Sequence, residues 1–162
     1  MKRLNSGFSL IEMLVVILIF SILAVLTTQS LATSLRGARK SESLGHVREN
    51  VEYAMNVMER SLRSAKELDC SVSGDRLQYF TSSGVTAFFE CDSGHIASNS
   101  AAARITSGDI RVTNCATVFT CDPGGSGVPG FVTITVTAQE EDIQGPESAQ
   151  YTSSTRILLR NY

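Results

Sequence analysis

The stretch that decides the fold of this chain lies at its N-terminus, where a short basic leader precedes a long apolar run. Its first sixteen residues read Met1-Lys2-Arg3-Leu4-Asn5-Ser6-Gly7-Phe8-Ser9-Leu10-Ile11-Glu12-Met13-Leu14-Val15-Val16. Within the 19 residues 8–26, only Ser9, Glu12 and Ser21 are polar. As an α-helix rising about 1.5 Å per residue, this segment is about 28 Å long, close to the thickness of the bilayer hydrocarbon. The sequence therefore predicts a helix that can span a membrane.

Length and charge narrow the class of protein further. The chain has 162 residues and a net charge of −2, which indicates one ordinary domain and excludes a multidomain machine. Residues 1–65 hold 8 Lys and Arg against 5 Asp and Glu, whereas residues 66–162 hold 6 against 11. This balance, without any dense basic tract, argues against a nucleic-acid partner held through phosphates. Cations stand on both sides of the apolar run, so their count alone leaves its orientation open.

Three interpretations of the N-terminal segment compete. The first is a secretory signal peptide, cleaved by ordinary signal peptidase after Ala32, which would leave a secreted protein. The second is a plain signal anchor. In the third, residues 2–16 resemble the cleavage and methylation motif of type IV pilins and type II secretion pseudopilins. That motif is a short basic leader ending in Gly, then Phe, Ser or Thr, Leu, Ile or Leu, Glu and a long apolar run. The detailed resemblance covers only residues 1–35.

The resemblance implies a role for three residues. A prepilin peptidase would cut between Gly7 and Phe8 on the cytoplasmic face, and the new amine of Phe8 would be N-methylated. Because the apolar run follows the cut, it is retained. A carboxylate such as that of Glu12 costs up to about 2.5–3.5 kcal/mol at the bilayer centre. In the pilin family the equivalent Glu faces the N-terminal amine of a neighbouring subunit, which would pair Glu12 with Phe8 of the next copy. The alternative is that Glu12 lies near the lipid headgroups and is merely tolerated.

Beyond the apolar run the sequence keeps a helical period and contains no proline before Pro123. Apolar residues recur at spacings of three and four, the pattern of one buried helix face. These residues are Leu44, Val47, Val51, Met55, Met58, Leu62 and Ala65. We therefore expect one helix from about Phe8 to about Ala65. Gly37 and Gly45 weaken it locally and allow a bend or flexible collar between residues 35 and 45.

After residue 66 the period changes to short β-type runs separated by turn residues. The predicted strands are residues 76–81, 85–91, 104–106, 110–120, 131–138 and 155–159. In residues 131–137 threonine alternates with apolar residues, which is typical of a strand with one packed and one wet face. The expected fold class is thus α+β: a long N-terminal α-helix, the membrane and filament spine, packed on a C-terminal antiparallel β-sheet in a pilin-like arrangement.

Four cysteines, Cys70, Cys91, Cys115 and Cys121, lie outside the apolar segment. An even number in a part expected to face the periplasm or exterior predicts two disulfides. Of the three possible connectivities we favour Cys70–Cys91, which would tie the helix end to the first hairpin, together with Cys115–Cys121, which would close a short loop. A zinc site is disfavoured because no knuckle with two to four intervening residues exists.

Other motifs carry no chemistry. Residues 125–130 spell G-x-G-x-x-G but precede a strand and contain a proline, so they are interpreted as a loop. The acidic run 140–142 is interpreted as a solvated turn, with calcium as the weaker alternative. His46 is expected on the helix surface and His95 in a turn after Gly94. Neither has a sequence neighbour that makes a nucleophile and base pair, so no catalytic residue, metal or cofactor is expected.

The sequence thus predicts four segments: a leader (1–7), a transmembrane and filament-core helix (8–31), its amphipathic continuation (32–66) and a globular antiparallel β domain (67–162). The predicted function is that of a structural subunit, a minor pilin or pseudopilin, of a type IV pilus, type II secretion or related filament. Expected partners are other pilin or pseudopilin subunits, prepilin peptidase, the inner-membrane assembly platform and membrane lipid before assembly.

The expected location is the inner membrane, crossed once with the C-terminal domain outside the cytoplasm, followed by a surface or periplasmic filament. One alternative is a filament-tip adhesin or ligand-binding module. The other is the secreted or anchored protein described above.

Overall fold

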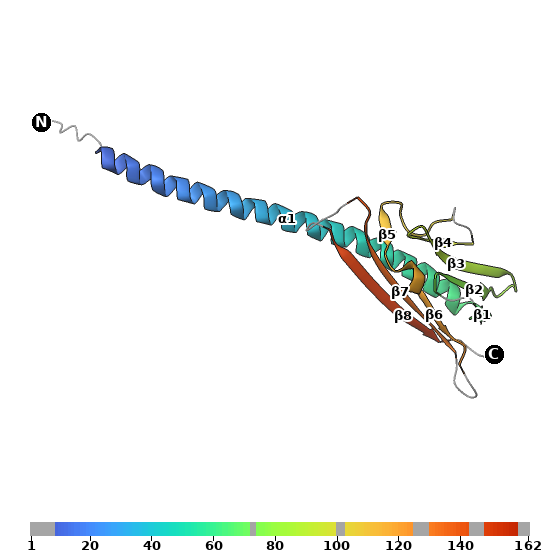
Figure 1. Ribbon diagram of the computed structural model, residues 1–162. Helices are drawn as coiled ribbons and strands as arrows, with labels where there is room; N and C mark the ends of the chain where they lie inside the picture. Colours follow the sequence, from blue (N-terminus) through green and yellow to red (C-terminus); the bar gives the residue numbers. More distant parts are fainter. Residues whose placement is uncertain (1–8, 72–73, 100–102, 125–129, 143–147, 159–162) are drawn as a thin grey trace, which may run out of the picture. The chain divides into compact units, whose positions relative to one another are not determined.

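The computed structural model describes residues 9–71, 74–99, 103–124, 130–142 and 148–158 (Figure 1). The chain divides into two compact units, residues 1–39 and residues 40–162, and the second unit is called the head below. One helix contributes to both units, and the strands lie in the head. The elements are α1 (Leu10–Arg63), β1 (Glu67–Asp69), β2 (Arg76–Phe80), β3 (Thr86–Asp92), β4 (His95–Ser98), β5 (Ile110–Val112), the 3-10 helix η1 (Cys115–Thr117), β6 (Phe119–Asp122), β7 (Phe131–Glu140) and β8 (Gln150–Leu158).

The part of α1 that belongs to the head buries one stripe of side chains. The buried residues are Ser43, Val47, Val51, Ala54, Met55, Met58 and Leu62. The predicted stripe is confirmed from Val47 to Leu62, whereas Ala65 lies beyond the end of the helix and is partly buried. At the start of the stripe the expectation is wrong, because Leu44 is 40% exposed and Ser43, four residues before Val47, occupies the buried face. The helix continues through Gly37 and Gly45.

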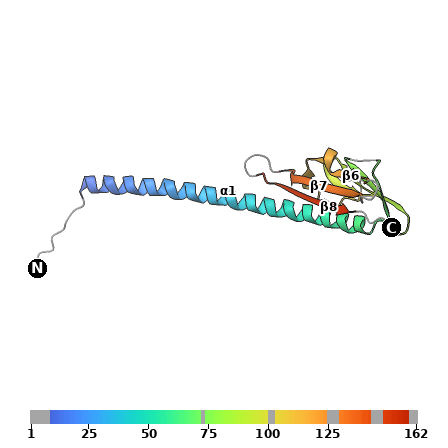
Figure 2. The ribbon, with the colours of Figure 1, turned by 90° about the horizontal axis from the view of Figure 1, so that it is seen from below.

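Two antiparallel sheets pack against this stripe. Sheet A has the order β1-β2-β3-β4. In sheet B, β8 pairs with β7 along residues 131–139, whereas β5 and β6 pair with successive stretches of β7 on its other edge. β7 and β8 run along the C-terminal part of α1 (Figure 2). A long N-terminal helix packed on antiparallel sheets is confirmed as the fold class.

The core lies between the helix stripe and the inner faces of both sheets. β7 shows the predicted alternation: four of its apolar side chains, those of Val132, Ile134, Val136 and Ala138, are fully buried. The threonines between them lie on the other face, where Thr135 and Thr137 share hydrogen bonds with Ser154 (2.9 Å) and Thr152 (3.0 Å) of β8. The strand therefore has one packed face and one hydroxyl-lined face.

Several predicted strand boundaries are wrong. β1 and β4 were not expected, and β8 begins at Gln150 rather than at residue 155. In the expected strand 104–106, only Arg104 forms an isolated bridge, to Ala97. The strand expected over residues 110–120 is instead two strands, β5 and β6, separated by η1.

β4 exists because a tight hairpin precedes it. Ser93 (φ 52°) and Gly94 (φ 84°) both have positive φ, as a two-residue turn that matches strand twist requires. Asp92 and His95 close this hairpin, so His95 is a strand residue and the expected turn position is wrong. A Cβ on Gly94 would lie 2.9 Å from Cγ of Arg111, which gives a second reason for glycine.

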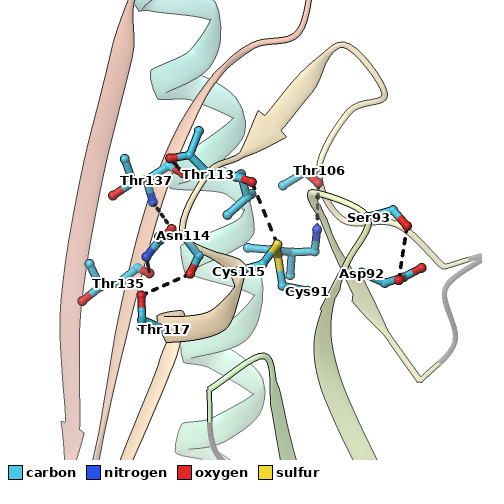
Figure 3. The surroundings of a disulfide bond; sticks show 12 residues. Cys91, Asp92, Ser93, Thr106, Thr113, Asn114, Cys115, Thr117, Thr135 and Thr137 are labelled. Carbon is cyan, nitrogen blue, oxygen red and sulfur yellow. Dashed lines mark hydrogen bonds between the residues drawn. A yellow bond between two sulfur atoms is a disulfide. The ribbon is translucent and has the colours of Figure 1, made fainter.

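Asn114 explains the break between β5 and β6. Its side-chain nitrogen donates to the carbonyl of Thr135, and its side-chain oxygen accepts from the backbone N–H of Thr137, both at 2.8 Å (Figure 3). The amide thus replaces a stretch of backbone in the ladder with β7. Because the backbone is released there, it can turn through η1 and carry Cys115 toward β3.

The two expected disulfides are present, but the favoured pairing is wrong. The bonds are Cys70–Cys121 and Cys91–Cys115, with Cα atoms 5.4 and 5.2 Å apart. Cys70 directly follows β1 and Cys91 lies on β3, two strands away, a separation of about 9.5 Å that is too long to bridge. Cys115 bonds to Cys91 of β3, whereas Cys121 bonds to Cys70, the residue that follows β1. The two disulfides therefore link β3 of sheet A, and the residue that follows β1, to the segment from η1 to β6.

Replacing Asn114 by alanine should destabilise the head. Asn114→Ala leaves the Thr137 N–H and the Thr135 carbonyl without their partner, so the free energy of unfolding should fall by about 2–3 kcal/mol. Urea unfolding of the full chain in detergent, followed by circular dichroism, measures it. Thr120→Ala, on the exposed face of β6, is the matched control and should cost less than about 1 kcal/mol. Equal effects of the two substitutions would contradict this role of Asn114.

Candidate functional site

The first candidate site is the apolar part of α1 in residues 10–39. Its large apolar side chains from Leu10 to Leu35 are all more than half exposed. Within the described residues, α1 is the one helix long and apolar enough to cross a membrane. A contiguous apolar surface of this kind needs lipid or other protein to cover it.

The first turn of α1 places Glu12 at a favourable position. The carbonyl of Ser9 accepts from the N–H groups of Glu12 (3.1 Å) and Met13 (3.3 Å), so Ser9 precedes the helix as its N-cap residue. A carboxylate in the first turn interacts well with the positive end of the helix dipole. Sequence reasoning missed this local effect, although the S-x-x-E spacing of Ser9 and Glu12 is typical of helix starts. The cleavage residues Gly7 and Phe8 lie outside the described residues.

Four hydroxyl groups in this segment form hydrogen bonds within the helix. Ser21 donates to the carbonyl of Ile17 (2.7 Å), Thr28 to that of Ala24 (2.8 Å), and Thr33 to that of Gln29 (2.9 Å). Thr27 bonds the preceding turn in the same way. Such bonds remove the cost of placing a hydroxyl in an apolar environment. Among residues 9–35, Glu12 is the one residue with a formally charged side chain.

In the head, a polar cluster joins α1 to the end of β7. Ser43 donates to Glu140 Oε2 (2.6 Å), and His46 Nδ1 lies 3.2 Å from Glu140 Oε1 and 3.6 Å from Asp109 Oδ2. His46 lies on the helix surface as expected, with its side chain 42% exposed, and it also contacts carboxylates from two other segments. The solvated turn expected at 140–142 is wrong for Glu140, which ends β7 and is partly buried, whereas Glu141 is exposed and lies 3.6 Å from Arg111.

A second polar contact joins α1 to β8. The hydroxyl of Tyr151 donates to Glu52, and the guanidinium of Arg48 lies 5.7 Å from the centroid of the Tyr151 ring. The hydrogen bond to Glu52 raises the pKa of Tyr151 above its usual value, with desolvation and the charge of Glu52 acting in the same direction. Burial raises the pKa of Tyr79 in the core. The contacts of Tyr151 with Glu52 and Arg48 orient β8 of sheet B on the helix.

No catalytic arrangement emerges in the described residues. His95 is buried, and its Nδ1 is without a hydrogen-bond partner there. In the described ranges no group of three or more His, Cys, Asp or Glu side chains is arranged to hold a metal ion. Most of the glycine-rich stretch 125–130 lies outside the described residues.

The exposed apolar side chains and the head are carried by one helix, α1. Residues 2–28 match the family model described as the prokaryotic N-terminal methylation motif. This motif indicates the type IV pilin and pseudopilin family, and it implies processing by prepilin peptidase and assembly with pilins. No curated protein and no solved structure matches the chain. The N-terminal helix and the motif are consistent with anchoring in the inner membrane before filament assembly.

The Tyr151 contact predicts a loss of stability at alkaline pH. Because the folded-state pKa is raised, its contribution is complete below the unfolded value of about 10 and is lost as pH rises through the folded value. The chain has four tyrosines and no tryptophan, so tyrosinate absorbance follows the titration directly. In the folded full chain, Tyr151→Phe should remove a transition centred above pH 10. It should also reduce the fall in unfolding free energy as the pH rises above about 10.

Tyr53→Phe is the control, because that ring is 61% exposed on α1. It should leave the alkaline loss of stability unchanged. A Tyr151→Phe protein that loses stability with pH as the wild type does would contradict the role of the Glu52 contact.

Proposed function

We propose that this protein is a structural subunit, a minor pilin or pseudopilin, of a type IV pilus, a type II secretion pseudopilus or a related type IV filament. The observation that carries the proposal is the methylation motif over residues 2–28, continuous with a helix whose apolar side chains are exposed. The motif supports a place in the filament pathway. The absence of proline before Pro123 supports the minor class, because many major pilins have a helix-breaking proline in the membrane half.

In this proposal, maturation begins at the cytoplasmic face. Prepilin peptidase removes residues 1–7 and the amine of Phe8 is methylated. The helix then remains in the inner membrane through residues 8–31 and continues as an amphipathic helix through residues 32–66. Residues 67–162 form the domain outside the cytoplasm, where the two disulfides can form.

Assembly transfers the apolar helix from lipid into the filament. Both environments are apolar, so the transfer changes little hydrophobic free energy, and packing and polar contacts decide it. Glu12 is the polar group available for this purpose. Its carboxylate would pair with the amine of Phe8 on a neighbouring subunit and so fix the stagger between adjacent helices. Burying both charges together replaces the isolated carboxylate, which is costly in lipid.

The proposal predicts a specific defect when the charge of Glu12 is removed. Glu12→Gln keeps the shape of the side chain but loses a charge-assisted hydrogen bond of about 1.5–3 kcal/mol. Incorporation into sheared filaments should therefore fall by about tenfold or more, whereas membrane insertion is retained. Immunoblotting of the filament and membrane fractions measures both.

Ser21→Ala is the matched control in the same apolar segment, because the Ser21 hydroxyl bonds only its own helix. It should be incorporated at the wild-type level. Wild-type incorporation of Glu12→Gln would refute the pairing of Glu12 with Phe8, and loss of both variants from the membrane would point to an anchoring role instead.

A further inference from the structure

The two disulfides of the head are nested. Cys70–Cys121 spans 51 residues of sequence and encloses Cys91–Cys115, which spans 24. Both bonds connect sheet A, or the residue that follows β1, with the β5 to β6 region of sheet B. Cys91 and Cys115 are consecutive cysteines, but Cys70 and Cys121 are the first and last of the four, so the outer bond closes the longest possible loop and needs folded contacts between the sheets to specify it.

The unfolded chain favours a different pairing. The entropic cost of closing a loop grows as about (3/2)RT ln n, so loop closure becomes less frequent as the −3/2 power of loop length. Cys115 and Cys121 are six residues apart, so they should meet about 25-fold more often than Cys70 and Cys121. Formation of Cys115–Cys121 leaves Cys70 and Cys91 to pair with each other. Chain statistics therefore lead to the non-native pairing.

The direction of export acts in the same sense. If residues 67–162 cross the membrane behind the anchored helix, as the proposed function requires, Cys70 and Cys91 reach the oxidising side before the other two cysteines. An oxidant that acts during export would then join this first pair. Both effects separate the cysteines that the native fold brings together.

Folding then closes access to the native bonds. Cys91 lies on the inner face of β3 and is 7% exposed, and the other three cysteines are partly buried. A partner thiolate can reach the sulfur of Cys91 only while β3 is apart from the rest of the core. Exchange that involves Cys91 must therefore occur before the head is packed, and packing of the core ends it.

We propose that the head is a substrate of a thiol–disulfide isomerase, which converts the pairs Cys70–Cys91 and Cys115–Cys121 into the native pairs. A dithiol oxidase supplies the first two disulfides and is itself reduced. The thiolate of the isomerase attacks Sγ of Cys121, the bond to Cys115 breaks, and its electron pair remains on Cys115 as a thiolate. That thiolate attacks Sγ of Cys91 and releases the Cys70 thiolate, which attacks Cys121 and expels the isomerase thiolate. The exchange has no net oxidation or reduction.

Oxidative refolding of the full chain in detergent tests this directly. The reduced, denatured chain is diluted into the disulfide form of a dithiol oxidase, either alone, with a thiol–disulfide isomerase, or with the same isomerase alkylated at its active thiol. Quenched samples are alkylated and digested with trypsin and chymotrypsin, whose cut after Phe119 separates Cys115 from Cys121, and the linked peptides are measured by mass spectrometry. With oxidase alone, early Cys115–Cys121 should exceed Cys70–Cys121 by about 25-fold. Active isomerase should convert it to native pairs, and alkylated isomerase should not.

The double variant Cys70→Ser with Cys121→Ser is the matched control. It can form only Cys91–Cys115, so its yield of that bond should not respond to the isomerase. Native pairs that form first with oxidase alone, or a native yield unaffected by active isomerase, would overturn the proposal. The measurement follows disulfide pairing in isolated chains, so such a result would not count against the proposed filament function. Conversely, a failure of filament assembly would not change the pairing that this experiment measures.

Discussion

The contact between the buried stripe of α1 and the inner faces of the two sheets holds the head together. Val47, Val51 and Met58 have no exposed surface, and β7 contributes four fully buried side chains to the same core. Burial of each large apolar side chain stabilises the fold by about 1.5–3 kcal/mol. The sheets do not form one continuous ladder, so the helix is the surface on which both are assembled. The polar contacts of Glu140 and Tyr151 with α1 depend on that packing.

A single helix thus carries two surfaces with different requirements. Residues 10–35 expose apolar side chains and satisfy the Ser and Thr hydroxyls described above within the helix, as an apolar environment demands. From Ser43 onward, the helix instead buries one face and exposes polar side chains on the other. This change along one element supports a protein that is anchored through one part of the helix and folded around another. Further constraints act inside the head. Asn114 fixes the start of η1 to β7, and the two disulfides tie the segment from η1 to β6 to Cys91 of β3 and to Cys70, the residue after β1.

Sequence reasoning succeeded where one local period determines the structure. The helix, the buried positions from Val47 and the alternation in β7 each follow from spacing alone. It failed where a distant segment decides. The strand expected at 110–120 breaks because Asn114 bonds to Thr135 and Thr137, some twenty residues later. The disulfide pairing depends on the packing of two sheets, which cysteine spacing does not encode.

The candidate site shows the same division. Glu12 is conspicuous in the sequence because a carboxylate interrupts an apolar run. The cluster of Ser43, His46 and Glu140 left no such signal, because Glu140 is more than ninety positions from the other two residues. Two signals were available in the sequence and were overlooked: the S-x-x-E spacing of Ser9 and Glu12 at the helix start, and the hairpin signal of Ser93 and Gly94, which would have placed His95 in a strand.

The central claim is that the apolar helix belongs to a processed filament subunit. Mass spectrometry of the N-terminal peptide from membrane-extracted protein, with and without prepilin peptidase, tests it most directly. The account predicts a chain that begins at N-methylated Phe8 when the peptidase is present and an uncut leader when it is absent. A chain that begins at Thr33, or an intact Met1 in the presence of the peptidase, would contradict it.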